Sequence, residues 1–165
     1  MQKVIALSAL ALALACGTAQ AQYSGGVIKI GVMNDMSGVY ADVSGPGGLE
    51  AAKMAVEDFG AEQKGMKVEV IGGDHQNKPD VGSNMARSWI DTQGVDVIVD
   101  VPTSSVALAV NQVVREKNKV FLASGPATSD LTGPQCSPNL VHWTYDTWAL
   151  ANGTGKAIVK TGGDT

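Results

Sequence analysis

Two short loops rich in hydroxyl side chains hold the groups of this sequence that are best suited to bind a ligand. The first covers residues 102–105 (PTSS), and the second covers residues 124–130 (SGPATSD). A helical pattern follows the first loop, and a helix N-terminus offers free N–H groups and a partial positive charge to a carboxylate. A hydroxyl of Thr103 or Ser104 is also suited to cap that helix. The first loop therefore predicts carboxylate binding, which is compatible with capping.

The second loop lets a ligand approach the backbone closely, because its side chains are small. Its Gly and Pro are typical of a turn, and Ser129 or Asp130 is suited to cap a short helical turn there. Both loops follow apolar segments that are predicted to be strands. Since ligands of open parallel sheets bind beyond the carboxyl ends of the strands, we expect both loops to contact one ligand.

Neither loop contains a nucleophile paired with a base. The sequence has no G-x-S-x-G, H-E-x-x-H or C-x-x-C motif, so it lacks common signatures of hydrolases, zinc proteases and redox sites. Asp74 and His75 are adjacent, but no third metal ligand is evident, and capping of the turn before Pro79 explains them better. We therefore predict a binding protein that is not an enzyme and that holds no metal and no cofactor.

An exported oxidoreductase with a Rossmann-like fold is the enzymatic alternative. Residues 45–48 supply only a G-x-G within a long loop, residues 34–48, whereas a dinucleotide fingerprint needs a tight turn. Glu50 also places a negative charge at the start of the next helix, where a pyrophosphate would bind. The sequence therefore argues against a bound nucleotide.

Apolar strand patterns alternate with amphipathic helix patterns along the chain. Strands are predicted at residues 27–33, 67–71, 95–101, 120–123 and 140–144. Helices are predicted to begin at Leu49, Pro79 and Ser105, and a fourth helix to cover residues 148–160. The buried stripe of the third helix is predicted to consist of Val106, Val110, Val113 and Val114. This order predicts one α/β domain, an open parallel sheet with helices on both faces.

Aromatic residues near the predicted strand ends are candidates for the walls of a pocket. Tyr40 lies in the long loop after the first strand, and Tyr145 follows the fifth strand. Packing of Tyr40 on its own loop is an equal alternative. Ordinary core packing explains Trp143 and Trp148, because large aromatic side chains are mostly buried.

The first 21 residues have the features of a secretory signal peptide. Lys3 precedes an apolar run over residues 4–15, and residues 19–21 (AQA) form a cleavage site. The run is shorter than the roughly 20 residues that span a bilayer. We therefore expect residues 22–165 to be the mature, exported chain. Lipid anchoring at Cys16 is a weaker alternative, since Ala13 stands where a lipoprotein site usually has Leu.

The composition argues against several classes of partner and site. The formal net charge is −4 at pH 7 and no basic run is present, so we expect neither nucleic acid nor an anionic membrane as a partner. Cys136 is the one cysteine after residue 21, so no disulfide forms within the mature chain. Its thiol is free or pairs with a cysteine outside this chain.

Six motifs are spread over the whole mature chain, and the combination of their order and spacing is specific. They are residues 30–38 (IGVMNDMSG), 51–56 (AAKMAV), 74–80 (DHQNKPD), 96–105 (DVIVDVPTSS), 124–132 (SGPATSDLT) and 142–147 (HWTYDT). With the signal peptide, they resemble the periplasmic solute-binding proteins of ATP-driven importers, of the type that binds branched-chain amino acids.

The resemblance implies a type I periplasmic binding protein fold, a two-lobed clamshell that closes on one ligand. The positions implied to contact the ligand are Ser104, Ser105, Ala127 and Thr128 at its carboxylate and Tyr40 and Tyr145 at its walls. The implied ligand is a hydrophobic amino acid or an aromatic or phenylpropanoid-like carboxylate. The implied partners of the monomeric protein are the permease subunits of an ABC importer. A ligand-sensing receptor domain of the same fold is the alternative.

Family members are longer than this chain and cross between two lobes. Residues 162–165 come where a loop would lead to a further strand, and we expect residues 22–165 to be the N-terminal lobe alone. Without the opposing half of the site, this fragment is expected to bind its ligand weakly or not at all.

Overall fold

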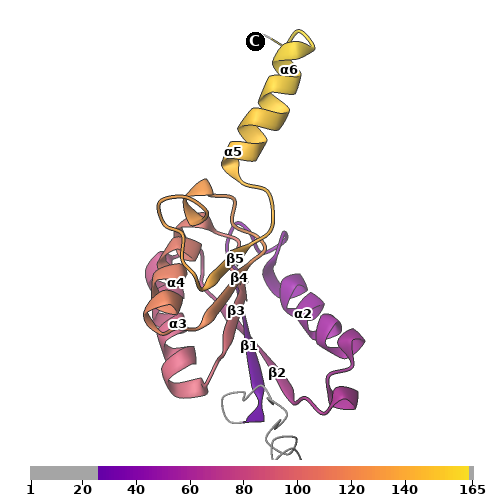
Figure 1. Cartoon of the computed structure of the whole chain (residues 1–165), viewed down its shortest axis with the longest axis vertical. Helices are drawn as coiled ribbons and strands as arrows, with labels where there is room; N and C mark the ends of the chain where they lie inside the picture. The colour runs from indigo at the N-terminus through magenta and orange to yellow at the C-terminus, as the bar shows by residue number, and fades with distance from the viewer. Residues whose placement is uncertain (1–25, 164–165) are drawn as a thin grey trace, which may run out of the picture.

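The computed structural model describes residues 26–163, so the predicted signal peptide and Cys16 lie outside the described residues. Five strands form one sheet in the spatial order β2-β1-β3-β4-β5 (Figure 1). The strands are β1 Ile28–Asn34, β2 Val68–Asp74, β3 Val97–Asp100, β4 Val120–Ala123 and β5 Leu140–His142. All neighbouring pairs are parallel, which confirms the open parallel sheet predicted from the sequence.

Three long helices cover the two faces of the sheet. Helix α2 (Gly45–Phe59) lies on one face, and α3 (Pro79–Gln93) and α4 (Ser104–Glu116) lie on the other (Figure 1). The chain runs from β1 outward to β2, then returns past β1 to β3 and continues to β4. Since crossovers between parallel strands are right-handed, this reversal sends α3 and α4 to the face opposite α2. The predicted placement of helices on both faces is confirmed.

The main hydrophobic core lies between the sheet and the α3–α4 layer. Phe121 of β4 and Ile98 of β3 are fully buried there. The stripe predicted for α4 is confirmed, since its four valines, Val106, Val110, Val113 and Val114, are buried in the same cluster. Apolar side chains are less completely buried on the α2 side of the sheet, where Phe59, Val120 and Val141 remain exposed.

A helical arm follows β5 and extends away from the sheet (Figure 1). It consists of α5 (Thr147–Leu150), one π-helical turn η4 (Ala151–Gly155) and α6 (Lys156–Lys160). The helix predicted at residues 148–160 is therefore present. The wide turn falls on Gly153 and Gly155, where glycine weakens an α-helix. The remaining short elements are the 3₁₀ turns η2 (Glu62–Lys64) and η3 (Ser129–Leu131).

Helix α2 begins earlier than predicted, at Gly45 and not at Leu49. Asn34 at the end of β1 explains the difference, because its side-chain Nδ2 donates to the carbonyls of Ser44 and Gly45 at 3.0 Å each. These bonds hold the first turn of α2 against the end of β1. Pro46 suits that turn, since its fixed φ matches a helix and its missing N–H is not needed there.

The prediction that Trp143 and Trp148 pack in the core is wrong for the described chain, since they are 57% and 67% exposed. Trp143 follows edge strand β5, and Trp148 lies on the arm. Trp89 of α3, by contrast, is buried. Its ring lies against Gly31 of β1, where an added Cβ would come within 2.5 Å of Trp89 Cε3.

Candidate ligand-binding site

An open hollow of about 1010 Å³ lies at the carboxyl edge of the sheet. It is lined by the loops that follow β1, β3 and β4, by the first turns of α2 and α4, and by the start of the arm. The chain turns to opposite sides after β1 and after β3, so this edge is the topological switch point of the sheet. Open α/β sheets bind their ligands at that point.

The loop after β3 opens with an unusual backbone. Asp100 and Val101 have φ values of 76° and 57°, in the left-handed region. A non-glycine residue in this region costs about 1–3 kcal/mol, and a β-branched residue adopts it rarely. Strain of this kind is concentrated at functional sites. Here the turn places Val101 in the core while Asp100 lines the hollow.

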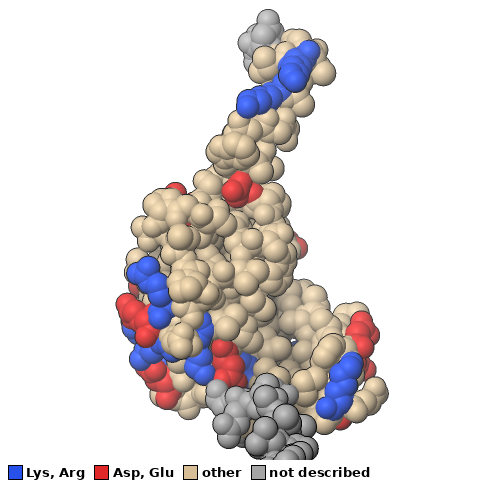
Figure 2. All heavy atoms as spheres, viewed as in Figure 1, with Lys and Arg blue, Asp and Glu red and all other residues tan. Residues whose placement is uncertain are grey.

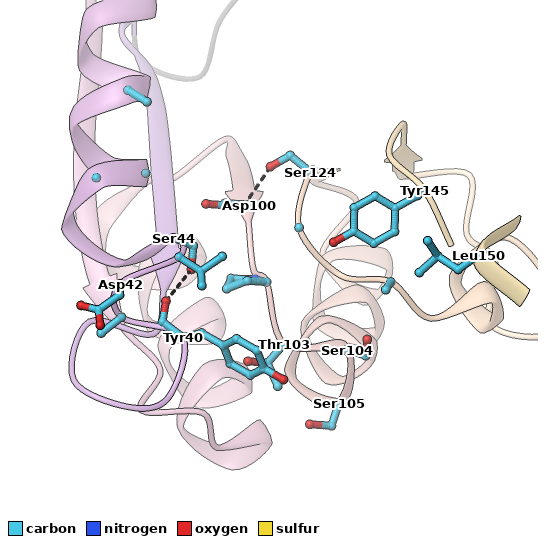
Figure 3. Close-up of a pocket in the computed structure, with 18 residues that line it drawn as sticks. Tyr40, Asp42, Ser44, Asp100, Thr103, Ser104, Ser105, Ser124, Tyr145 and Leu150 are labelled. Carbon is cyan, nitrogen blue, oxygen red and sulfur yellow. Dashed lines mark hydrogen bonds between the residues drawn. The ribbon is translucent and has the colours of Figure 1, made fainter. Parts of the chain in front are cut away.

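Asp100 is held by neighbours from three segments. The hydroxyl of Ser124 donates to its Oδ1 at 3.0 Å (Figure 3), and the side-chain amide of Asn34 lies beside it. Gly48 of α2 passes so close that an added Cβ would lie 2.8 Å from Asp100 Oδ2. Burial raises the pKa of Asp100 above its ordinary value, although the polar groups of Ser124 and Asn34 beside the carboxylate oppose the shift.

The start of α4 presents its hydroxyl groups without using them as a cap. Ser104 and Ser105 line the hollow, as the sequence predicts for a site. Thr103 occupies the N-cap position, but no side chain caps the helix, and Thr103 Oγ1 is buried without a hydrogen-bond partner among the described residues. The predicted capping by Thr103 or Ser104 is therefore wrong. Within residues 26–163, the first N–H groups of α4 therefore have no side-chain cap.

The loop after β4 is organised differently. Ala127 lines the hollow, and its carbonyl accepts from Thr147 N at 2.7 Å, which ties this loop to the start of the arm. Thr128 Oγ1 accepts from Asp130 N at 3.3 Å and caps η3, so the cap is Thr128 and not Ser129 or Asp130. Thr128 does not line the hollow itself.

Two tyrosines reach toward the hollow from opposite sides (Figure 3). Tyr40 belongs to the loop after β1, and buried Asp35 orders that loop by accepting from Gly38 N at 2.8 Å and Tyr40 N at 3.0 Å. Tyr145 comes from the segment between β5 and α5. The structure thus brings five of the predicted positions together, namely Tyr40, Ser104, Ser105, Ala127 and Tyr145.

Sequence reasoning did not single out the two acidic residues that line the hollow, Asp100 and Asp42, whereas Ser124 lies in the second predicted loop. A signal for Asp100 was available, because it is an acidic residue at the carboxyl end of a buried strand. Among the described lining residues, Asp42 and Asp100 are acidic and none is Lys or Arg. In Figure 2 the Lys and Arg side chains lie on the α3–α4 side, at the far end of α2 and on the arm.

The pair Asp74 and His75 forms a turn, as predicted. Asp74 Oδ1 accepts from Gln76 N at 2.8 Å and from Met36 N at 2.9 Å. Burial raises the pKa of Asp74, but hydrogen bonds from Ser37 and from these two N–H groups, with the charge of His75, lower it overall. No group of three metal-ligating side chains occurs within residues 26–163.

Two further findings concern the described part of the chain. Cys136 is exposed and forms no disulfide there. No helix in residues 26–163 is long and apolar enough to cross a membrane.

Comparison with known proteins identifies the fold and the family. The family model described as "Periplasmic binding protein" matches residues 27–165. A periplasmic binding protein from Burkholderia mallei is 51% identical, with a TM-score of 0.81 over 85% of this chain and 37% of its own. A branched-chain amino acid ABC transporter periplasmic ligand-binding protein from Burkholderia xenovorans is 35% identical, with a TM-score of 0.76 over 82% of this chain and 36% of its own.

A third solved structure, a solute-binding protein of an ABC transporter from R. palustris in complex with 4-hydroxybenzoate, is 25% identical with a TM-score of 0.70. The match covers 82% of this chain and 36% of that one. No curated protein matches the sequence. The chain spans little more than a third of the length of the solved proteins that it matches. From the family match and the fold, the chain belongs to the periplasmic binding protein family.

Proposed function

We propose that residues 22–165 are the N-terminal lobe of an extracytoplasmic substrate-binding protein, which captures a small carboxylate for an ABC importer. The observation that carries this proposal is the start of α4 at the switch point. There Ser104 and Ser105 line the hollow, and the first N–H groups of the helix have no side-chain cap. Such a helix start favours a negatively charged ligand.

The ligand we propose is a hydrophobic amino acid or an aromatic acid. Its carboxylate would lie at the start of α4 beside Ala127, with Thr128 shaping that loop, and its apolar part between Tyr40 and Tyr145. Among proteins of this fold, one from R. palustris is in complex with benzoate and one from Streptococcus pneumoniae with isoleucine. The hollow is large enough for either kind of molecule, since ligand pockets measure about 300–1,000 Å³.

Binding, and not a chemical step, is the proposed function. The hollow is open to solvent, and we propose that a second lobe closes over the ligand there. The complex, a monomer in the periplasm after removal of residues 1–21, would then meet the permease subunits. A protein of this kind needs neither a cofactor nor a metal.

A thermal-shift screen of the full-length protein tests the proposal. Leucine, isoleucine, benzoate and 4-hydroxybenzoate are compared with isobutylamine and benzyl alcohol, which resemble them but lack the carboxylate. At 100 times its Kd a ligand adds about 2.7 kcal/mol to the free energy of unfolding, so one carboxylate should raise Tm clearly while the two controls do not. The proposal fails if no carboxylate raises Tm, or if the purified protein carries the absorbance of a bound NAD or flavin.

A further inference from the structure

The role of Asp100 goes beyond the proposed function and rests on it. We infer that Asp100 determines specificity by accepting a hydrogen bond from a donor group, an ammonium or a hydroxyl, which the ligand carries in addition to its carboxylate. The inference comes from the backbone around Asp100, from the hydrogen bonds that hold it, and from the charges of the hollow.

The backbone turns Asp100 out of the core and toward the hollow. Side chains alternate between the faces of a strand, so a regular continuation of β3 would put Asp100 on the same face as buried Ile98. The left-handed conformation of Asp100 and Val101 breaks this alternation. Val101 fills the core, and the Asp100 carboxylate lies beside Gly48 in the first turn of α2. Gly125 on the other side leaves room, since an added Cβ would lie 3.0 Å from Asp100 Oδ1.

The carboxylate keeps acceptor capacity after its internal bonds are made. An ionised carboxylate has about four lone-pair positions. Ser124 fills one of them. That bond, with the amide of Asn34 beside the carboxylate, fixes the orientation of the group. At least one oxygen lone pair is therefore left for a ligand, and a preoriented acceptor discriminates well because little freedom is lost on binding.

The charges of the hollow favour a ligand with a donor. Asp100 and Ser104 line the same hollow, so a small ligand whose carboxylate binds at the start of α4 brings a negative charge near Asp100. No lining Lys or Arg among the described residues offsets the two charges. Like charges at short range disfavour each other. An ammonium or hydroxyl placed toward Asp100 relieves this repulsion, whereas a ligand with a carboxylate alone leaves it in place.

Calorimetric titration of the full-length protein with three probes tests the inference. The probes are benzoate, which has the carboxylate alone, 4-hydroxybenzoate, which adds a hydroxyl, and isoleucine, which adds an ammonium. We expect one donor-bearing probe to bind at least about tenfold more tightly than benzoate, as for a charge-assisted hydrogen bond. The probe that does so identifies the donor.

Variants then assign the discrimination to Asp100. Asp100→Ala should weaken the preferred probe about tenfold and leave benzoate unchanged or bound more tightly. Asp100→Asn should partly restore binding of a hydroxyl donor but not of an ammonium, because the amide keeps an acceptor oxygen and loses the charge. Asp58→Ala, which removes an exposed carboxylate of α2 away from the hollow, is the control and should change no affinity.

The outcomes separate this inference from the proposed function. Urea unfolding of each variant first establishes that it is folded. If no probe binds the wild-type protein, the proposed function itself fails. If benzoate binds as tightly as both donor-bearing probes, or if Asp100→Ala weakens all three alike, a carboxylate site exists but Asp100 does not select its ligand.

Discussion

The two loops that follow β3 and β4 lie side by side at the hollow but use their polar groups in opposite ways. In the loop after β3, the hydroxyls do not cap α4, and Thr103 Oγ1 has no partner among the described residues. In the loop after β4, Ser124 bonds to Asp100 and Thr128 caps η3. Similar sequences therefore produce one loop with free polar groups and one whose polar groups hold its own structure.

We therefore expect the loop after β3 to bind the ligand and the loop after β4 to fix the shape of the site. Free hydroxyls and N–H groups bind a ligand without first losing a bond within the protein. Hydroxyls already bonded within the protein contribute by fixing the shape of the site, because the geometry of a site decides how well its donors are aimed. Substitutions in and around these loops should separate their effects on stability from their effects on affinity.

The largest effect is expected where the two loops touch. A Cβ on Gly125 would lie 2.7 Å from the backbone Cα of Pro102, so Gly125→Ala forces the loops apart and should lower the free energy of unfolding by about 1–3 kcal/mol. Urea unfolding measures the loss. Gly47→Ala is the matched control, since nothing lies within 4 Å of its added Cβ. Ala is more stable than Gly in a helix, so Gly47→Ala should leave the free energy of unfolding unchanged or raise it. An equal loss of this free energy in both variants would contradict the close contact between Gly125 and Pro102.

An intermediate effect should separate the free hydroxyls from the bonded ones. Ser105→Ala should weaken ligand binding by about 1 kcal/mol or more while Tm of the free protein stays unchanged. Thr128→Ala removes the cap of η3 and should lower the free energy of unfolding by about 1 kcal/mol, with a smaller change in affinity. Calorimetric titration and urea unfolding of both variants check the contrast. The opposite result would show that the second loop holds the ligand directly.

The smallest effect concerns pH and contrasts the carboxylates that end β3 and β2. Burial raises the pKa of Asp100 above 3.8, so its contribution to stability is lost as pH rises from 3.8 through its own pKa. The pKa of Asp74 is lowered below 3.8, because the hydrogen bonds from Ser37, Met36 and Gln76 outweigh its burial, so its contribution is lost as pH falls below 3.8.

Relative to wild type, Asp100→Asn should therefore gain stability as pH rises, and Asp74→Asn should lose it. Urea unfolding at pH values from about 3 to 7 measures both trends. Trends of the same sign in the two variants would show that the two carboxylates do not differ in this way.

The sequence predicts most of the sheet and its helices, because apolar periodicity and strand order depend on local pattern and on the handedness of crossovers. It also places Tyr40, Ser104, Ser105, Ala127 and Tyr145 near one another, since all follow strand ends. It does not predict the start of α2, which depends on the contact between Asn34 and distant carbonyls. Nor does it predict the direction of Asp100, which depends on two φ angles that no periodicity encodes.

The exposure of Trp143 and Trp148 could not be predicted for a related reason. Composition indicates that a tryptophan prefers to be buried, but burial requires a second element to cover it. Within the described residues, no element covers the outer face of β5 or the arm, where these two side chains lie.

The arm has a consequence for how the molecule exchanges its amide hydrogens with solvent. Within the described residues, and apart from the bond from Thr147 N to the Ala127 carbonyl at its start, the backbone bonds of the arm run along α5, η4 and α6. Large apolar side chains on it, Trp148, Leu150, Ile158 and Val159, are exposed. A helix with so few tertiary contacts opens without disturbing the sheet. Deuterium should therefore enter the arm long before it enters β3, and later protection of the arm would mark the moment at which another element covers it.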